Sequence, residues 1–108
     1  MFRLQEPSFL VLTALASGTQ HGYGITKDVH ALSEGAVTLR VGTLYGALDR
    51  LAAAGLVTVD REEVVDSRLR RYYRLTQAGA ERLADAATQQ KRQAEAALRR
   101  LGTAGATA

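Results

Sequence analysis

The sequence predicts a mainly helical fold with one small β-hairpin and a long helix after it. Three apolar stretches with helical spacing lie between residues 7 and 54, and two β-rich runs lie between residues 56 and 75. A further helical pattern continues from there to about residue 101. With 108 residues, 46% of them hydrophobic, the chain can bury the core of a single domain.

The first two helices are expected on either side of a short polar connector. Pro7 can occupy the first position of helix one, whose residues 9–16 are almost entirely apolar, and Gly18 can end it. Residues 19–24 are polar and rich in glycine, as in a connector. After them, apolar residues recur at helical spacing from Ile25, which predicts a short amphipathic helix.

The third helix has the clearest pattern, and Gly55 is placed to end it. One continuous apolar face is expected to seat it on the core, formed by Val41, Leu44, Tyr45, Leu48, Leu51 and Ala52. The opposite face is expected to be open and made of small side chains, namely Gly42, Thr43, Gly46 and Ala47, with Arg40 and Arg50 at its ends.

Residues 56–60 and 70–75 are predicted to pair as a hairpin, with the turn signal Asp66–Ser67 in a charged tip over residues 62–69. Between Arg61 and Arg74 the hairpin is basic, because this stretch has five arginines (Arg61, Arg68, Arg70, Arg71 and Arg74) and only three acidic residues. These charges suit contact with phosphates, but they also suit an edge hairpin that is protected from edge-to-edge pairing.

Three helices followed by a hairpin form the winged helix-turn-helix plan, whose third helix enters the major groove of DNA. We therefore predict a winged helix-turn-helix domain at residues 1–75, with a three-helix core and a two-stranded wing. Small side chains let the helix backbone approach base edges, and Thr43 can hydrogen-bond to a base. The DNA-binding residues predicted in this way are Arg40, Thr43, Gly46, Ala47, Arg50, Arg68 and Arg70.

Residues 76–101 are predicted to form a C-terminal dimerisation helix, with Thr76 as its N-cap, followed by a disordered tail at residues 102–108. A head of this size cannot cover so long a helix, so a monomer would expose its apolar side. A symmetric dimer would bury that side and place two recognition helices about 34 Å apart. The predicted dimerisation residues are Leu83, Ala87, Ala94, Leu98 and Leu101. The alternative is a solvated helix that projects alone.

Three segments resemble the PadR family of transcriptional regulators. They are HGYGI at residues 21–25, GTLYGALDRL at residues 42–51 with GLV at 55–57, and RYYRLTQAG at residues 71–79. The resemblance covers about residues 7–85 and implies a homodimeric repressor that binds a palindromic operator. It also implies that Thr43 and Tyr45 face or adjoin DNA; the pattern of the helix suggests that the Tyr45 ring packs while its hydroxyl reaches a phosphate.

Composition argues against other classes of protein. The chain has no cysteine and only two histidines, so thiolate chemistry is excluded and a metal ligand set is hard to assemble. We therefore expect no enzyme, no cofactor and no metal site. The apolar run Phe9–Ala16 is too short to span a membrane, which predicts a cytoplasmic protein. Two alternatives stay open: a protein-interaction module that does not bind DNA, and a sensor that responds to an unidentified small-molecule effector.

Overall fold

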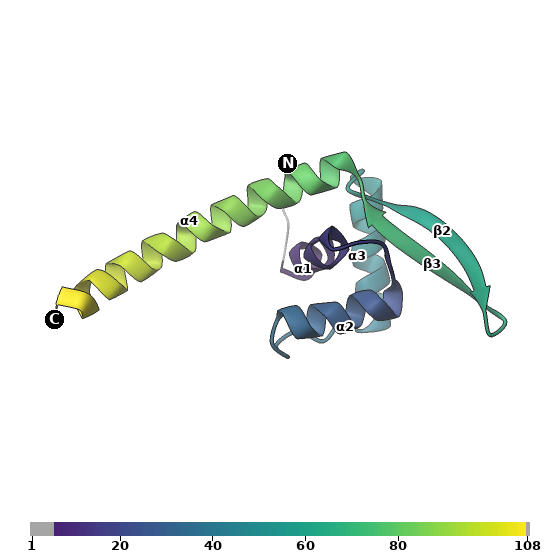
Figure 1. Ribbon diagram of the computed structural model, residues 1–108, viewed down its shortest axis with the longest axis horizontal. Helices are drawn as coiled ribbons and strands as arrows, with labels where there is room; N and C mark the ends of the chain where they lie inside the picture. The colour runs from purple at the N-terminus through teal and green to yellow at the C-terminus, as the bar shows by residue number, and fades with distance from the viewer. Residues whose placement is uncertain (1–5, 108) are drawn as a thin grey trace.

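The computed structural model of the chain describes residues 6–107, with side chains described from residue 6 to residue 102. Within this range, helices form a compact head from which the hairpin projects at one end and the last helix at the other (Figure 1). The predicted mainly helical fold is confirmed. The elements are α1 (Glu6–Ala16), β1 (Gln20–His21), α2 (Gly22–Leu32), α3 (Val41–Ala53), β2 (Val57–Val65), β3 (Arg68–Leu75) and α4 (Gln77–Thr107).

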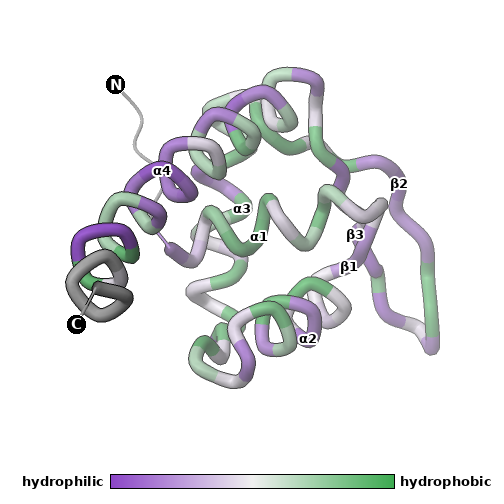
Figure 2. Tube along the Cα trace, turned by 60° about the vertical axis from the view of Figure 1, so that its left-hand side comes forward, coloured by the Kyte–Doolittle hydropathy of each residue, from purple (hydrophilic) through white to green (hydrophobic). Residues whose placement is uncertain are grey.

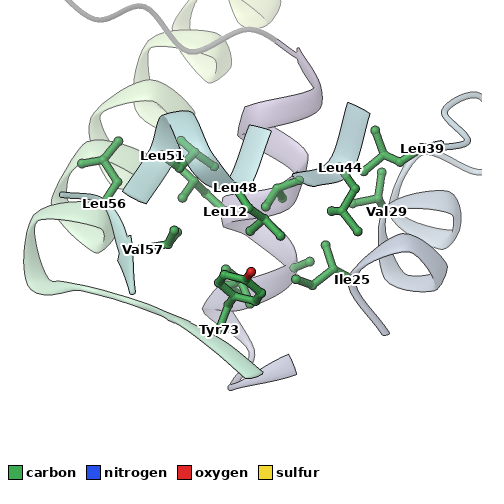
Figure 3. Packing of buried hydrophobic residues seen from close by; sticks show 13 residues of the cluster. Leu12, Ile25, Val29, Leu39, Leu44, Leu48, Leu51, Leu56, Val57 and Tyr73 are labelled. Atoms are coloured by element: carbon green, nitrogen blue, oxygen red, sulfur yellow. The ribbon is translucent and has the colours of Figure 1, made fainter. Parts of the chain in front are cut away.

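The hydrophobic core lies where the first three helices meet the base of the hairpin. Figure 3 shows Tyr73 of β3 directed toward Leu12 of α1 and Ile25 of α2, so the sheet is fastened to the helices by an aromatic side chain. Each of the three helices contributes side chains that are almost fully buried. The largest of them are Leu12, Ile25, Leu48, Leu51, Val11 and Val29.

The end of α3 leads directly into the hairpin, as the sequence predicts. Gly55 has a φ of +77°, a left-handed conformation that glycine adopts without a steric penalty. The next backbone N–H, of Leu56, donates to the carbonyl of Leu51 at 2.9 Å, which closes the helix end. The wing is therefore fixed to the C-terminal end of α3.

The hairpin is longer than predicted. Its strands reach Val65 and begin again at Arg68, and only Asp66 and Ser67 form the turn, with φ values of +51° and +64°. Positive φ at both central residues matches the two-residue turns that follow the twist of paired strands. The prediction that residues 62–69 form the tip is wrong, because residues 62–65 and 68–69 belong to the paired strands, in which Glu62 lies opposite Arg71.

A third strand, β1, was not predicted. Gln20 and His21 pair antiparallel with Tyr73 and Tyr72, which gives the strand order β1-β3-β2. The side-chain amide of Gln20 donates to the carbonyl of Ala14 at 2.8 Å and so ties the strand to α1. Two residues carry too little pattern to be read as a strand, and α2 consequently begins at Gly22, three residues before the apolar stripe from which it was predicted.

The buried stripe of α3 is rotated from the predicted one. It consists of Leu44, Ala47, Leu48 and Leu51, whereas the predicted members Val41, Tyr45 and Ala52 are exposed. Ala47 is completely buried, so its predicted position on the open, DNA-facing side is wrong. Its small side chain lies within the i, i+3, i+4, i+7 stripe centred on Leu48, and the sequence pattern did not distinguish this alanine from the exposed ones.

Helix α4 begins as predicted and continues further than predicted. The N–H of Gly79 donates to the Thr76 hydroxyl at 2.9 Å, which confirms the N-cap. The helix reaches Thr107, so residues 102–107 of the predicted tail are helical, and residue 108 lies outside the described residues. Gly102 and Gly105 lower the helix propensity of this segment, so the sequence alone did not predict the continuation.

Candidate nucleic-acid interface

The N-terminal half of α3 presents an open surface. Arg40, at the N-cap, has an extended backbone, and its carbonyl accepts the first helical hydrogen bond from Leu44. Gly42 and Thr43 are exposed, and a β-carbon built at Gly42 would meet no atom within 4 Å. A backbone this open can come close to another molecule.

Tyr45 connects this surface to the start of α2. Its side chain leaves α3 at the edge of the buried stripe and is 40% exposed. A β-carbon at Gly22 would lie 2.5 Å from the Tyr45 hydroxyl oxygen, so the phenol lies directly against the backbone of α2. The hydroxyl end of the side chain thus lies against α2 while 40% of the residue stays exposed, so Tyr45 does not belong to the buried face in which the sequence placed it.

A groove of about 550 Å³ separates the start of α2 from the outer part of the wing. It is open along one side of β3, where β1 has already ended and no strand covers the edge. The groove is rich in cations and phenols. Its lining includes His21, Gly22, Tyr23, Tyr45, Arg68 and Arg70.

Three of the five wing arginines are engaged by acidic residues of the wing. Arg71 Nε lies 2.7 Å from Glu62, and this hydrogen bond raises the pKa of Arg71 above its usual value. Arg74 and Arg61 lie 3.4 Å and 3.6 Å from Asp60. All these pairs are exposed, so each stabilises the wing only slightly. Their main effect is to hold these arginines to the wing itself.

Arg68 and Arg70 differ from the other three. Among the described residues, no carboxylate lies within 4.0 Å of either guanidinium. Both line the groove opposite Tyr45. They are therefore the wing cations available to an external anion, and they are the two wing arginines that the sequence analysis predicted to bind DNA.

The base of the wing is fastened to the start of α2 through Tyr72. The rings of Tyr72 and His21 are nearly perpendicular, with their centres 5.4 Å apart. The guanidinium carbon of Arg61 lies 3.9 Å from the centre of the Tyr72 ring. The Tyr72 hydroxyl donates to Glu63 at 2.6 Å. A β-bulge at Asp60 shifts the register between Val59 and Arg61 and so sets this alignment.

His21 caps α2. Its Nδ1 accepts a hydrogen bond from the Gly24 N–H at 3.2 Å, which requires that this nitrogen carry no proton. Burial lowers the pKa of His21, and the nearby Arg70 cation lowers it further, against a smaller opposing effect of Glu63. The neutral imidazole is thus the form that the fold favours.

The predicted DNA-binding residues fall into two groups. Tyr45, Arg68 and Arg70 come together at the groove, while Arg40, Thr43 and Arg50 are exposed along α3. Gly46 is half-buried, because the Arg50 guanidinium folds back to 3.5 Å from the position that a Gly46 β-carbon would take. Arg50 therefore covers part of the face that small residues were expected to leave open.

Tyr23 was not predicted as a site residue, although it belongs to the HGYGI segment. It is 71% exposed and lines the same groove. The Lys27 amino group lies 5.6 Å from the centre of its ring, one helical turn further along α2. The sequence did offer one signal for an exposed aromatic residue here, because Tyr23 precedes the apolar stripe of α2 and does not belong to it.

The predicted dimerisation residues of α4 differ in their exposure. Leu83 is half-buried against the core of the head, whereas Ala87 and Ala94 are exposed. Leu98 and Leu101 are 66% and 72% exposed. Figure 2 shows hydrophobic and hydrophilic segments alternating along α4 beyond the head. The outer apolar stripe therefore has no cover within the described part of this chain.

A second hollow, of about 460 Å³, lies between α1, the end of α2 and α4. Phe9 and Leu10 supply its apolar wall, and Glu6 and Gln90 lie at its rim. Within residues 6–107, no group of three or more histidine and carboxylate side chains is arranged to hold a metal ion. In the same range, no helix combines the length and hydropathy that a membrane crossing requires.

Known proteins resemble this chain in sequence and in fold. The sequence pattern of the transcriptional regulator PadR-like family matches residues 11–85. The transcriptional regulator Rv3488 of Mycobacterium tuberculosis is 42% identical over 69 residues, which cover 64% of this chain and 61% of that protein. The chain thus spans less than two thirds of the length of this curated relative.

Two solved structures illustrate the shared fold. A PadR family regulator from Clostridium difficile has a TM-score of 0.69 and 24% identity, covering 88% of this chain and 96% of that one. Bacillus subtilis PadR, solved in complex with operator DNA, has a TM-score of 0.64 and 24% identity. That alignment covers 72% of this chain and 44% of the Bacillus subtilis chain.

Proposed function

The chain belongs to the PadR-like family of transcriptional regulators, and from this premise we propose that it is a repressor that binds a palindromic operator as a homodimer. The family consists of regulators and not of enzymes, in agreement with the sequence-based expectation. The observation that carries the proposal is the open N-terminal half of α3 beside a groove that is lined by Arg68 and Arg70, two cations with no carboxylate within 4.0 Å among the described residues.

In this proposal α3 lies in the major groove, with Thr43 toward the base edges and Arg40 and Arg50 toward phosphates or a guanine. The wing lies over the adjacent backbone, where Arg68 and Arg70 neutralise phosphates and supply affinity that does not depend on sequence. The Tyr45 hydroxyl, at the border of groove and helix, reaches a phosphate between them. Bacillus subtilis PadR, which has the same fold, was solved in complex with operator DNA, and this supports DNA as the partner in the proposal.

The proposed dimer forms through α4. Leu98 and Leu101 expose large apolar side chains beyond the head, and a two-fold pairing would remove them from water. Two α3 helices on one side of such a dimer would meet successive turns of a palindromic operator. A regulator of this kind would act in the cytoplasm, where it meets the chromosome.

A small-molecule effector is a second element of the proposal. The hollow between α1 and α4 combines an apolar wall with polar groups at its rim, the composition expected of a ligand site. Because α4 also carries the proposed dimer surface, a ligand there could change the spacing of the two recognition helices. A thermal-shift screen of small organic molecules, with Ala36→Trp as the variant that fills the hollow, tests this element.

The proposal is tested by selecting bound sequences from random duplex DNA with the full chain. The enriched duplex and a scrambled one are then titrated by fluorescence anisotropy at two salt concentrations. We expect tighter binding of the enriched duplex and a loss of affinity for both duplexes at the higher salt concentration. Failure to bind any DNA at low salt would refute the proposal and favour a winged helix that contacts proteins only.

A substitution on the proposed docking face sharpens the test. Thr43→Trp places a bulky side chain at an exposed position of α3, so the fold should be preserved while the helix is held away from the bases. We expect loss of the preference for the enriched duplex with an unchanged circular dichroism spectrum. Unchanged preference in this variant would mean that α3 does not dock through this face.

A further inference from the structure

The outer end of the wing carries an apolar pair that the head cannot bury. Val64 of β2 and Leu69 of β3 lie directly opposite each other and are 72% and 60% exposed. Figure 2 shows hydrophobic residues near the outer end of the hairpin, away from the core. Large apolar side chains that are exposed together in this way often mark a surface that contacts another molecule.

This apolar pair is not an extension of the core. On the same face of the hairpin, the next pair toward the head is Glu62 and Arg71, joined at 2.7 Å. Only beyond that ion pair does the buried Tyr73 follow. The Val64–Leu69 pair is therefore separated from the hydrophobic core by a charged pair and forms a surface of its own.

The position of the Val64–Leu69 pair beside the recognition helix indicates which kind of molecule it contacts. Leu69 lines the same groove as Tyr45, so the wing tip and the recognition helix border one opening. Arg68 precedes Leu69 in the strand and alternates to the other face of the hairpin, but it lines the same groove and has no carboxylate within 4.0 Å among the described side chains. In Figure 1 the wing and the outer part of α4 lie at opposite ends of the molecule. Because the second copy is proposed to pair with α4, it would lie far from the wing tip.

We propose that Val64 and Leu69 contact the minor groove of the operator and give the wing a preference for A·T pairs outside the segment that α3 reads. This inference rests on the proposed DNA-binding function. A duplex that fills the opening with α3 in its major groove brings its neighbouring minor groove beneath the wing tip. Proteins that bind the minor groove frequently place apolar side chains, leucine among them, at its base steps.

The preference follows from the chemistry of the groove floor. A·T pairs present only acceptors there, whereas G·C pairs add the N2 amino donor of guanine. Covering that amino group with valine or leucine removes it from water and leaves it without an acceptor, which is unfavourable. The apolar pair therefore disfavours guanine at these positions without contacting any base in the major groove.

The test uses the duplex enriched from random DNA, with hydroxyl-radical footprinting to locate the flanks under the wing. Three versions carry A·T, G·C or inosine·C pairs in those flanks. Inosine lacks the N2 amino group, so its pair with C resembles A·T in the minor groove and G·C in the major groove. We expect the A·T and inosine·C duplexes to bind alike, and the G·C duplex to bind about tenfold more weakly.

The double variant Val64→Thr, Leu69→Thr should abolish this difference, because threonine hydroxyls can accept from the amino group. Val59→Thr is the matched control: Val59 lies on the same face near the head, 43% exposed, and should keep the preference. Equal binding of the three duplexes by the unmodified chain, or an unchanged preference in the double variant, would overturn the inference. Equal binding would then favour a protein partner for the pair, while the proposed function itself would fail only if no duplex bound.

Discussion

The hydroxyl of Tyr45 in α3 occupies the space that a side chain at Gly22 in α2 would need. A β-carbon at Gly22 would lie 2.5 Å from the hydroxyl oxygen and 3.2 Å from the ring carbon that bears it. The absence of a side chain at residue 22 thus determines where the phenol of Tyr45 lies, and with it one wall of the groove beside the recognition helix.

Gly22→Ala should weaken DNA binding more than it weakens the fold. The added methyl group displaces the Tyr45 phenol, which is 40% exposed and can move outward, and it comes within 3.3 Å of Leu44 Cδ2 in the core, so we expect a change in unfolding free energy of about 1 kcal/mol. The displaced hydroxyl should lose its proposed phosphate contact, which lowers affinity about tenfold. Chemical denaturation and anisotropy titration measure the two effects separately.

A double-mutant cycle with Tyr45→Phe completes this test. Tyr45→Phe alone removes the hydroxyl and should cost about as much affinity as Gly22→Ala. The two substitutions together should cost little more than either one, because both act on the same oxygen. Additive losses would show that Gly22 influences binding by another route.

The wing arginines should separate into two classes when the salt dependence of binding is measured. Arg70→Ala should reduce the slope of log K against log salt concentration by about one, and Arg68→Ala should do the same, because each removes one proposed phosphate contact. Arg71→Ala, in the same strand, is the control and should leave the slope nearly unchanged, since Arg71 is engaged by Glu62. Equal slopes for all three variants would contradict the assignment.

Most of the fold could be predicted because each long element carries its own periodic signal. The ends at Gly55 and Thr76 were predicted correctly from capping chemistry that involves only neighbouring residues. The family resemblance, carried by short strings on α2, α3 and β3, is confirmed by the matched residues 11–85. The antiparallel strand β1 could not be predicted, because its two residues are ordered by partners more than fifty positions away in the chain.

The candidate site was predicted less completely, for a physical reason that Ala47 and Tyr23 illustrate. Alanine occurs on both buried and exposed helix faces, so the sequence alone did not show that Ala47 is fully buried. Tyr23 gains its place at the groove only when the wing folds back beside α2. Arg68 and Arg70, which line the groove, could be chosen as candidates because the charge of the wing is evident from the local sequence.

The stability of the fold should respond to pH through His21. Because the folded state lowers the pKa of His21 below its unfolded value of about 6.5, the unfolded chain binds more protons between these two values. The contribution of the neutral imidazole is therefore complete above about pH 6.5 and is lost as the pH falls through the lowered pKa.

His21→Asn separates this effect from the titration of carboxylates. Asparagine can cap a helix and does not titrate in this range. When the pH is lowered from about 7.5 to about 5.5, roughly one unit on either side of the unfolded pKa, the free energy of unfolding of the variant should therefore fall less than that of the natural chain. His21→Ala should lose about 1 kcal/mol already at the higher pH, because the Gly24 N–H loses its acceptor. Identical pH profiles for His21→Asn and the natural chain would contradict the role of the imidazole.

The proposed dimer predicts a strong effect of charge in the outer stripe of α4. Leu98→Glu should produce monomers in sedimentation velocity, because burying a carboxylate at two symmetry-related positions costs about 2 kcal/mol or more at each. Gln89→Glu is the matched control: it adds the same carboxylate to the same exposed helix on the opposite side, given 3.6 residues per turn. Dissociation by both variants, or by neither, would argue against this stripe as the interface.

Gly79 and Gly102 lie in the same helix and should respond in opposite ways to the same substitution. A β-carbon at Gly79 would collide with the backbone carbonyl of Leu56, whereas one at Gly102 would meet nothing within 4 Å. The Leu56 carbonyl is itself held in place by the N–H of Thr76 at 3.1 Å, so it cannot move aside without opening the junction between α4 and the wing.

Gly79→Ala should therefore lower the free energy of unfolding by about 1 to 3 kcal/mol, the usual cost of forcing extra volume into a packed site. Gly102→Ala should raise it slightly, by at most about 1 kcal/mol, because alanine favours the helix. Urea denaturation of the two variants beside the natural chain provides the measurement. If Gly79→Ala were as stable as Gly102→Ala, α4 would not rest on the carbonyl of Leu56, and the wing and the last helix would be free to move independently.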